Sequence, residues 1–101
     1  QSIVNISSEN ELIPSEFKLS QNYPNPFNQL SIINFKCSIG GNVSIVVYDL
    51  LGREVKTLIN EYKQAGTYQV SFNAEGLSSG IYFYKMTAGD FSETKKLVLV
   101  K

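Results

Sequence analysis

The sequence predicts an all-β protein, built as one antiparallel sandwich of about seven short strands. Apolar residues recur with a period of two in several short segments, which is typical of half-buried strands. These segments are separated by stretches rich in Gly, Asn, Ser and Asp, and none of them shows the period of an amphipathic helix. The chain has 101 residues, of which 43% are apolar, so its length and composition fit a single folded domain.

Residues 1–16 are predicted to be a linker that precedes the domain of residues 17–101. The segment is rich in Ser, Asn and Glu and has no sustained apolar period. Ile3, Val4 and Ile6 are the residues by which it would dock as a short edge segment, a less favoured alternative.

A stiff corner is predicted at residues 21–28, Gln-Asn-Tyr-Pro-Asn-Pro-Phe-Asn. Pro24 and Pro26 donate no backbone hydrogen bond, hold φ at about −65° and bias the preceding residues toward an extended conformation. Either Tyr23 and Phe27 plug one end of the core, or the corner is a recognition epitope. The local sequence favours the plug.

The remaining strand signals follow at short spacing. Alternating segments cover residues 31–37, 43–49, 53–59 and 67–73, with Phe17–Leu19 ahead of them and a terminal hairpin after them. Asp49-Leu50-Leu51-Gly52 is a predicted turn, because Asp bonds nearby backbone amides and Gly takes positive φ. We expect residues 60–66 to form a polar loop, and residues 74–79 to form a loop with Leu77 as a plug. This spacing indicates a sandwich of immunoglobulin type, although the Cys-Trp-Cys pattern of antibody domains is missing.

The hairpin at residues 80–101 is predicted to turn at Gly89-Asp90, since Gly accepts the positive φ of a two-residue loop. This register places Tyr82 opposite Leu97 on one face, and Ile81 opposite Val98 and Phe83 opposite Lys96 on the other. The run from Leu97 to Val100 is apolar on both faces, unlike a half-exposed strand. The terminal strand is therefore either buried or available to a partner, and the two readings are close to even. Lys95, Lys96 and Lys101 bracket this run and protect it from aggregation.

Catalysis and cofactor binding find no support in the composition. His is absent and Cys37 is the only cysteine, which excludes an internal disulfide and nucleophilic Ser-His or Cys-His catalysis. Cys37 shares a period of two with Ile33 and Phe35, so we expect a buried, inert thiol. The carboxylates show no catalytic spacing, and Asp49 and Asp90 lack the acidic cluster of a calcium site. We therefore expect no enzyme, no cofactor and no metal.

Nine basic and nine acidic residues give zero net charge, which provides no electrostatic argument for nucleic acid or an acidic membrane. No segment has the form of a membrane span or a signal peptide, so export would require a signal that was removed or lies upstream. A carbohydrate-binding module is an alternative, with Tyr48, Tyr62, Tyr82 and Tyr84 as candidate platform residues. Against it, Trp is absent and only Tyr62, in the polar loop, is expected to be exposed.

Five ordered segments carry a resemblance to a known family. They are Leu19–Asn28 (LSQNYPNPFN), Val47–Val55 (VYDLLGREV), Ala65–Tyr68 (AGTY), Leu77–Lys85 (LSSGIYFYK) and Lys95–Leu99 (KKLVL). Together they resemble the type A C-terminal sorting domain of the type IX (Por) secretion system of Bacteroidota, over residues of about 13–101. The central part is also similar to the immunoglobulin-like domain of flagellar hook-capping proteins, so a structural spacer is a second alternative. Many family members have Pro where this chain has Gln29.

The resemblance implies a C-terminal signal on a larger exported cargo protein. Its partners would be the type IX translocon and a surface sortase and attachment complex, with the outer membrane involved only indirectly. The protein would cross the periplasm and reach the cell surface or the medium, with cleavage within residues 1–16. The recurrent family motifs map to Tyr23, Pro24, Asn25, Pro26, Phe27, Asn28, Gly80, Tyr82, Lys95, Lys96, Leu97, Val98, Leu99, Val100 and Lys101. Whether these residues contact the translocon or only build the fold, and whether the domain dimerises, is left open.

Overall fold

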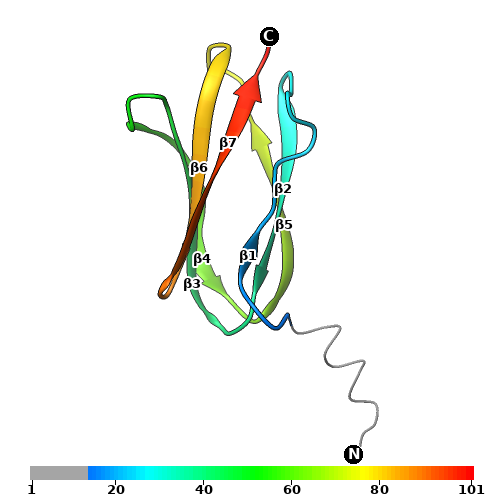
Figure 1. Ribbon diagram of the computed structural model, residues 1–101, viewed down its shortest axis with the longest axis vertical. Coiled ribbons are helices and arrows are strands. Elements are labelled where there is room, and N and C mark those ends of the chain that lie inside the picture. The colour runs from blue at the N-terminus through cyan, green and yellow to red at the C-terminus, as the bar shows by residue number, and fades with distance from the viewer. Residues whose placement is uncertain (1–13) are drawn as a thin grey trace, which may run out of the picture.

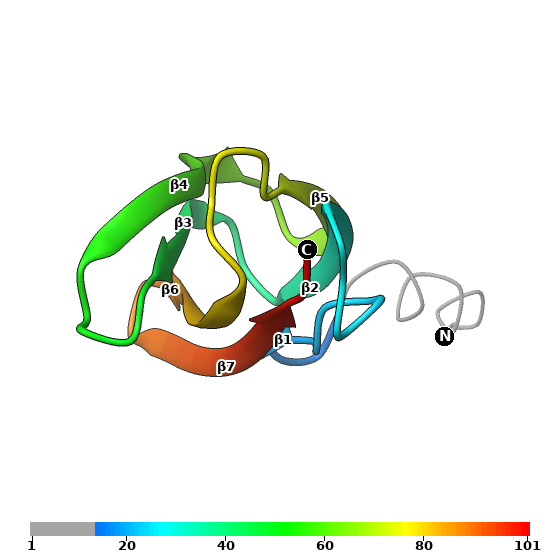
Figure 2. The same cartoon turned by 90° about the horizontal axis from the view of Figure 1, so that it is seen from above.

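The computed structural model describes residues 14–101, which form seven strands and contain no helix. The strands are β1 (Lys18–Leu19), β2 (Leu30–Cys37), β3 (Gly41–Tyr48), β4 (Glu54–Lys63), β5 (Gly66–Asn73), β6 (Gly80–Ala88) and β7 (Phe91–Leu99). They make a three-stranded sheet in the order β1-β2-β5 and a four-stranded sheet in the order β4-β3-β6-β7, with antiparallel pairing throughout. The two sheets face each other across the core (Figures 1 and 2). The predicted fold class, an immunoglobulin-like β-sandwich, is confirmed.

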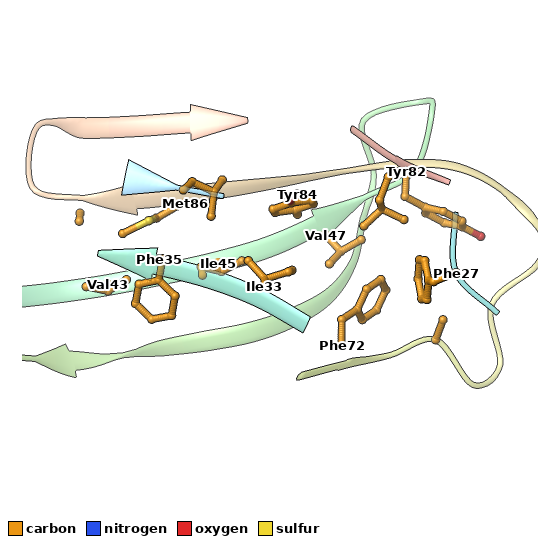
Figure 3. Packing of buried hydrophobic residues seen from close by; sticks show 14 of the residues in the cluster. Phe27, Ile33, Phe35, Val43, Ile45, Val47, Phe72, Tyr82, Tyr84 and Met86 are labelled. Atoms are coloured by element: carbon orange, nitrogen blue, oxygen red, sulfur yellow. The ribbon is translucent and has the colours of Figure 1, made fainter. Parts of the chain in front are cut away.

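The core forms because alternate residues of β2, β3, β6 and the end of β7 point between the sheets. Its largest fully buried side chains include Tyr84, Phe35 and Phe72 (Figure 3). Cys37 is also buried, and burial raises the pKa of its thiol, partly opposed by nearby Lys63. The expected burial of Cys37 is therefore confirmed.

The terminal hairpin has the predicted turn and the predicted register. Strands β6 and β7 are joined by Gly89-Asp90, and Gly89 has a φ of +59°, which a residue with a Cβ adopts only with strain. Tyr82 pairs with Leu97, Ile81 with Val98 and Phe83 with Lys96. Tyr82 and Leu97 are buried on the inner face.

The predicted polar loop at residues 60–66 is wrong. Strand β4 continues to Lys63 and β5 starts at Gly66, so only two residues connect them. The polar composition of residues 60–63 reflects the edge position of β4, which is exposed along most of its length while its backbone pairs with β3. Backbone pairing needs no apolar side chain, and this is why the pattern concealed the strand.

The turn between β3 and β4 is confirmed. The Asp49 carboxylate accepts hydrogen bonds from the backbone N–H groups of Leu51 and Arg53, each at 2.9 Å, and from Arg53 Nε at 2.9 Å. These bonds, chiefly that from the Arg53 backbone, hold the pKa of Asp49 below its usual value. The geometry leaves Leu50 and Leu51 at the tip of the turn, 65% and 77% exposed.

The connections divide between the two ends of the sandwich. Residues 20–29, the β3–β4 turn, the β5–β6 connection and Lys101 lie at one end, which we call the C-terminal end (Figure 1). The other three connections lie at the opposite end, where Phe17 stacks on Phe91 with 5.5 Å between ring centroids. The predicted docking of Ile3, Val4 and Ile6 falls outside the described residues, and the boundary at residues 16 and 17 stays a prediction.

Candidate recognition surface

The corner before β2 is anchored by its own first residues. The backbones of Tyr23 and Ile32 exchange two hydrogen bonds of 2.8 Å, which fixes the start of the corner against β2. The peptide bonds before Pro24 and Pro26 are both cis. The result is a non-repetitive segment that turns away from β2 at Tyr23.

A small buried polar cluster supports the corner from beneath. Asn22 Nδ2 donates to Ser31 Oγ at 2.9 Å and to the Pro24 carbonyl at 3.0 Å, and Ser31 Oγ also donates to that carbonyl at 2.9 Å. Asn22 and Ser31 are the buried polar residues of the described chain. Because a buried polar group without a partner is costly, this closed set of bonds fixes the path of the chain through Pro24.

The same corner covers the outer edge of β7. Phe27 N–H donates to the Val98 carbonyl at 3.0 Å, and Val100 N–H donates to the Phe27 carbonyl at 2.8 Å, which makes a parallel bridge. Asn25 Oδ1 accepts from Val98 N–H at 3.0 Å, and Gln21 Nε2 donates to the Lys96 carbonyl at 2.7 Å. The terminal strand is therefore paired with β6 on one side and with residues 21–27 on the other.

The chain terminus is tied to the β5–β6 connection as well. Lys101 N–H donates to Ser79 Oγ at 2.9 Å, and the buried Tyr82 hydroxyl donates to the Ser78 carbonyl at 2.7 Å. Between them, Gly80 pairs with Leu99 and has a φ of +153°. A Cβ at Gly80 would meet no atom within 4 Å, so a substitution there would act through backbone strain alone.

Two aromatic side chains join this assembly to the core. Phe27 is buried and its ring packs against Phe72, with centroids 5.5 Å apart (Figure 3). Tyr84, fully buried, donates its hydroxyl hydrogen to the Ser20 carbonyl at 2.7 Å, immediately before the corner. Burial raises the pKa of Tyr84 to about 12.

The structure thus brings the predicted motif residues together and sorts them into two sets. Those that build the fold are buried: Phe27, Tyr82, Leu97 and Leu99. Those that face solvent are Tyr23, Pro24, Asn25, Pro26, Asn28, Gly80, Lys96, Val100 and Lys101, with Val98 and Lys95 half-buried. Lys95 pairs with Glu93 at 3.2 Å. The predicted plug is correct for Phe27 and wrong for Tyr23, which is 77% exposed because its backbone pairing with Ile32 points the ring outward.

Sequence reasoning missed a group of exposed apolar residues at the C-terminal end. The sequence predicts Leu50 and Leu51 only as part of a turn, but they lie beside Ile81 and Tyr82 around a shallow hollow of about 220 Å³. Leu30 and Ile81 are also exposed, in the first two residues of β2 and β6, and both strands start at this end (Figure 1). Two adjacent leucines at the tip of an Asp-Gly turn were the available signal, because such turns are normally polar.

The described residues give little support to sugar binding, metal binding or membrane insertion. Of the candidate sugar-platform residues, Tyr82 and Tyr84 are buried and Tyr48 is half-buried. Tyr62 is exposed as predicted but lies on β4, far from the other exposed tyrosine, Tyr23. Within residues 14–101, no three His, Cys, Asp or Glu side chains gather into a possible metal site. No helix long and apolar enough to cross a membrane occurs in that range.

The fold and this surface define a small β-sandwich module whose last strand is enclosed by an earlier segment of the chain. Residues 21–101 match the family described as the secretion system C-terminal sorting domain, and the chain belongs to this family. The domain is therefore a C-terminal sorting signal for type IX secretion, and it marks a secreted protein that reaches the cell surface or the medium. The family is one of sorting signals and not of enzymes.

The fold recurs in a solved structure. The crystal structure of dimeric latent PorU from Porphyromonas gingivalis superposes with a TM-score of 0.61 at 18% sequence identity. The match covers 79% of this chain and 9% of the PorU chain, so this chain corresponds to a small part of that protein. No curated protein matches the sequence significantly.

Proposed function

We propose that the folded domain is recognised by the type IX translocon through the C-terminal end of the sandwich. The observation that carries this proposal is the hydrogen-bonded assembly of residues 21–27 with β7 and the β5–β6 connection. Motifs that are far apart in the sequence become one continuous surface only when the domain is folded. An unfolded chain would not present that surface.

Within this surface, the exposed motif residues make the contacts and the buried ones hold them in place. Tyr23 offers an aromatic ring with a polar tip, which suits a contact surface at low entropic cost. Val100 is exposed after the end of β7, Lys101 adds positive charge next to it, and Lys96 adds a second exposed charge within the strand. We expect the translocon to bind an apolar patch of Tyr23 and Val100, with Lys96 and Lys101 as positive charges at its margin.

The position of the first described residues supports a cargo domain upstream. Phe17 lies at the opposite end of the sandwich from Lys101 (Figure 1). A cargo domain attached before residue 14 would leave the C-terminal end accessible to the translocon. On this proposal the protein crosses the periplasm folded, and a surface sortase then cleaves within residues 1–16 and attaches or releases the cargo.

The test is export of a periplasmic reporter fused to Ile13–Lys101 in a type IX-competent host. The wild-type fusion is expected outside the cell or on its surface. Replacing Tyr23 and Val100 by Ser should leave the fusion folded and retained in the periplasm. Tyr62→Ser, which removes an exposed tyrosine at the opposite end, should be exported normally. Retention of the wild-type fusion, or normal export of the Tyr23/Val100 variant, would contradict the proposal.

A deletion of Leu97–Lys101 is a poorer test. It removes Leu97 and Leu99, which are both buried, so the domain should unfold as well as lose its terminus. Side-chain replacement at exposed positions separates recognition from folding, and the deletion does not.

A further inference from the structure

Three of the four sheet edges in the described domain carry a recognisable protection against strand pairing. Strand β1 is only two residues long. Strand β4 has two register shifts against β3 and carries alternating charges, among them Glu61 and Lys63. Strand β7 is covered at its C-terminal half by residues 21–27. Short length, bulges, charges and covering segments are the devices by which natural proteins block unwanted strand addition.

The edge of β5 has none of these devices. The strand is eight residues long (GTYQVSFN) and contains no charged residue and no proline. Its register against β2 is unbroken from Asn73 to Gly66. Its outward side chains are neutral hydrogen-bonding groups, Thr67, Gln69, Ser71 and Asn73, and all are exposed. Strand β4 makes one side-chain hydrogen bond to the β5 backbone among the described residues, at the last residue of the strand, where Lys56 Nζ donates to the Asn73 carbonyl.

We propose that the outer edge of β5 accepts an extended, acidic segment of a protein in the export pathway by strand addition. The proposal rests on the sorting function given above and adds a second contact site to it. In strand addition the main-chain hydrogen bonds supply affinity, and the flanking side chains supply specificity. The other sheet of the domain offers no edge that is comparably open.

The positive charge of the three-stranded sheet favours an acidic segment as the strand that pairs with β5. The strands of the three-stranded sheet carry Lys18 and Lys36 and no acidic residue. Lys18 pairs with Lys36, and Lys36 pairs with Thr67, so these residues form one row across the exposed face that ends at the β5 edge. An added strand would place its next side chain opposite Thr67, one strand beyond Lys36, where the positive potential of the two lysines favours a carboxylate over a like charge.

Two further cations flank the same edge. Lys63 Nζ lies 4.9 Å from the centroid of the Tyr68 ring, while it also pairs with Glu61 at 2.8 Å. Lys56 lies at the far end of the strand, bound to Asn73. The edge is thus a neutral hydrogen-bonding strip with lysines at its margins, which complements an acidic extended peptide.

The first experiment uses two short synthetic peptides of alternating Thr and Val, one with Glu and one with Lys at the same two positions. Each is titrated into the ¹⁵N-labelled 101-residue chain. The Glu peptide should shift the amide signals of Gly66–Asn73 and slow their hydrogen exchange, and the Lys peptide should bind about tenfold more weakly. Equal binding of the two peptides, or shifts on β4 instead of β5, would overturn the proposal. Concentration-dependent shifts of these amides without peptide would assign the edge to a second copy of the chain and overturn it as well.

The second experiment measures export of the reporter fusion. Gln69→Lys with Ser71→Lys adds two charges to the open edge, and Thr57→Lys with Asn60→Lys adds the same charge to the protected edge of β4. The β5 pair should reduce export and the β4 pair should not, with both variants folded by circular dichroism. If the wild-type fusion is exported and the β5 pair is exported equally, the strand-addition proposal fails while the sorting function stands. If the wild-type fusion is retained, the sorting function itself fails.

Discussion

The outer edges of β7 and β5 are the two long, regular edges of this sandwich. One is covered by another segment of the chain and the other is not. The edge of β7 is hydrogen-bonded to Gln21, Asn25 and Phe27, so a segment some seventy residues earlier in the chain covers it. The edge of β5 has no covering segment among the described residues, and the strand itself contains no charged residue. The apolar terminal strand, which by its sequence looks the more exposed to aggregation, is thus the better protected one.

This difference changes how the terminal strand is understood. The sequence predicts that the terminal strand is either buried or available to a partner. In the structure, some of its residues are buried and others are exposed. Leu97 and Leu99 are buried, the corner covers the C-terminal half of the backbone edge, and Val100 and Lys101 remain exposed beyond the strand. What a partner can contact is therefore the rim formed by the corner and the terminus, not a free strand.

Removing the segment that covers the β7 edge should have the largest effect on the stability of the domain. Phe27→Ala removes a buried ring that packs on Phe72 and holds the corner down, so the free energy of unfolding should fall by about 3–5 kcal/mol. Urea unfolding followed by circular dichroism measures this loss. Phe27→Leu should recover most of the stability. A loss below about 1 kcal/mol for the Ala variant would mean that the corner stays in place without its anchor.

Alkaline pH should release the same segment through Tyr84. The hydroxyl that donates to the Ser20 carbonyl has a pKa raised to about 12 by burial, against 10.0 for the free group. Between these values the unfolded chain loses this proton and the folded one keeps it, so stability should fall by about 1.4 kcal/mol per pH unit. Below pH 10 this group contributes no pH dependence.

The measurement is thermal unfolding of the wild type and of Tyr84→Phe from pH 9 to pH 12. The Phe variant lacks the titrating group, so the difference between the two curves isolates its contribution from that of the lysines. The wild type should lose stability more steeply than the variant above pH 10. Parallel curves would contradict the assignment of the raised pKa to Tyr84.

Removing a single hydrogen bond between residues 21–27 and β7 should have a smaller effect on stability. Asn25→Ala removes the side chain that accepts from Val98 N–H, which should cost about 0.5–1.5 kcal/mol. Hydrogen exchange of the Val98 amide should accelerate, while exchange in β5 should not change. Asn28→Ala is the matched control, since Asn28 is exposed and its side chain makes no hydrogen bond with the described residues. Equal acceleration in both variants would show that Asn25 does not protect the edge.

The local order of the fold was predictable because strand periodicity and turn chemistry act over a few residues. The β6–β7 register follows from Gly89-Asp90, and the β3–β4 turn follows from Asp49 and Gly52. The extent of β4 was not predictable, because an edge strand can be polar on both faces. The outward direction of Tyr23 depends on its pairing with Ile32, a contact that no local pattern reveals.

The candidate surface was predictable as a list of motif residues but not as an arrangement. The resemblance named both the corner and the terminal strand, yet their contact depends on Asn25 and Gln21 meeting the backbone of β7. Gln21 and Asn22 lie in the predicted corner, but neither they nor Ser31 were among the predicted motif residues. Such side-chain bonds to distant backbone leave no periodic signal.

The smallest effect on stability, and the sharpest test of where recognition ends, should come from the β3–β4 turn. Leu50→Ser with Leu51→Ser changes two exposed side chains and leaves the Asp49 bonds intact, so the free energy of unfolding should change by less than about 0.5 kcal/mol. Export of the reporter fusion should nevertheless fall if the apolar hollow beside Ile81 belongs to the contact surface. Ile39→Ser removes an exposed apolar side chain at the opposite end and should have no effect on export. Normal export of the Leu50/Leu51 variant would confine recognition to the corner and the terminus, where the β7 edge is covered.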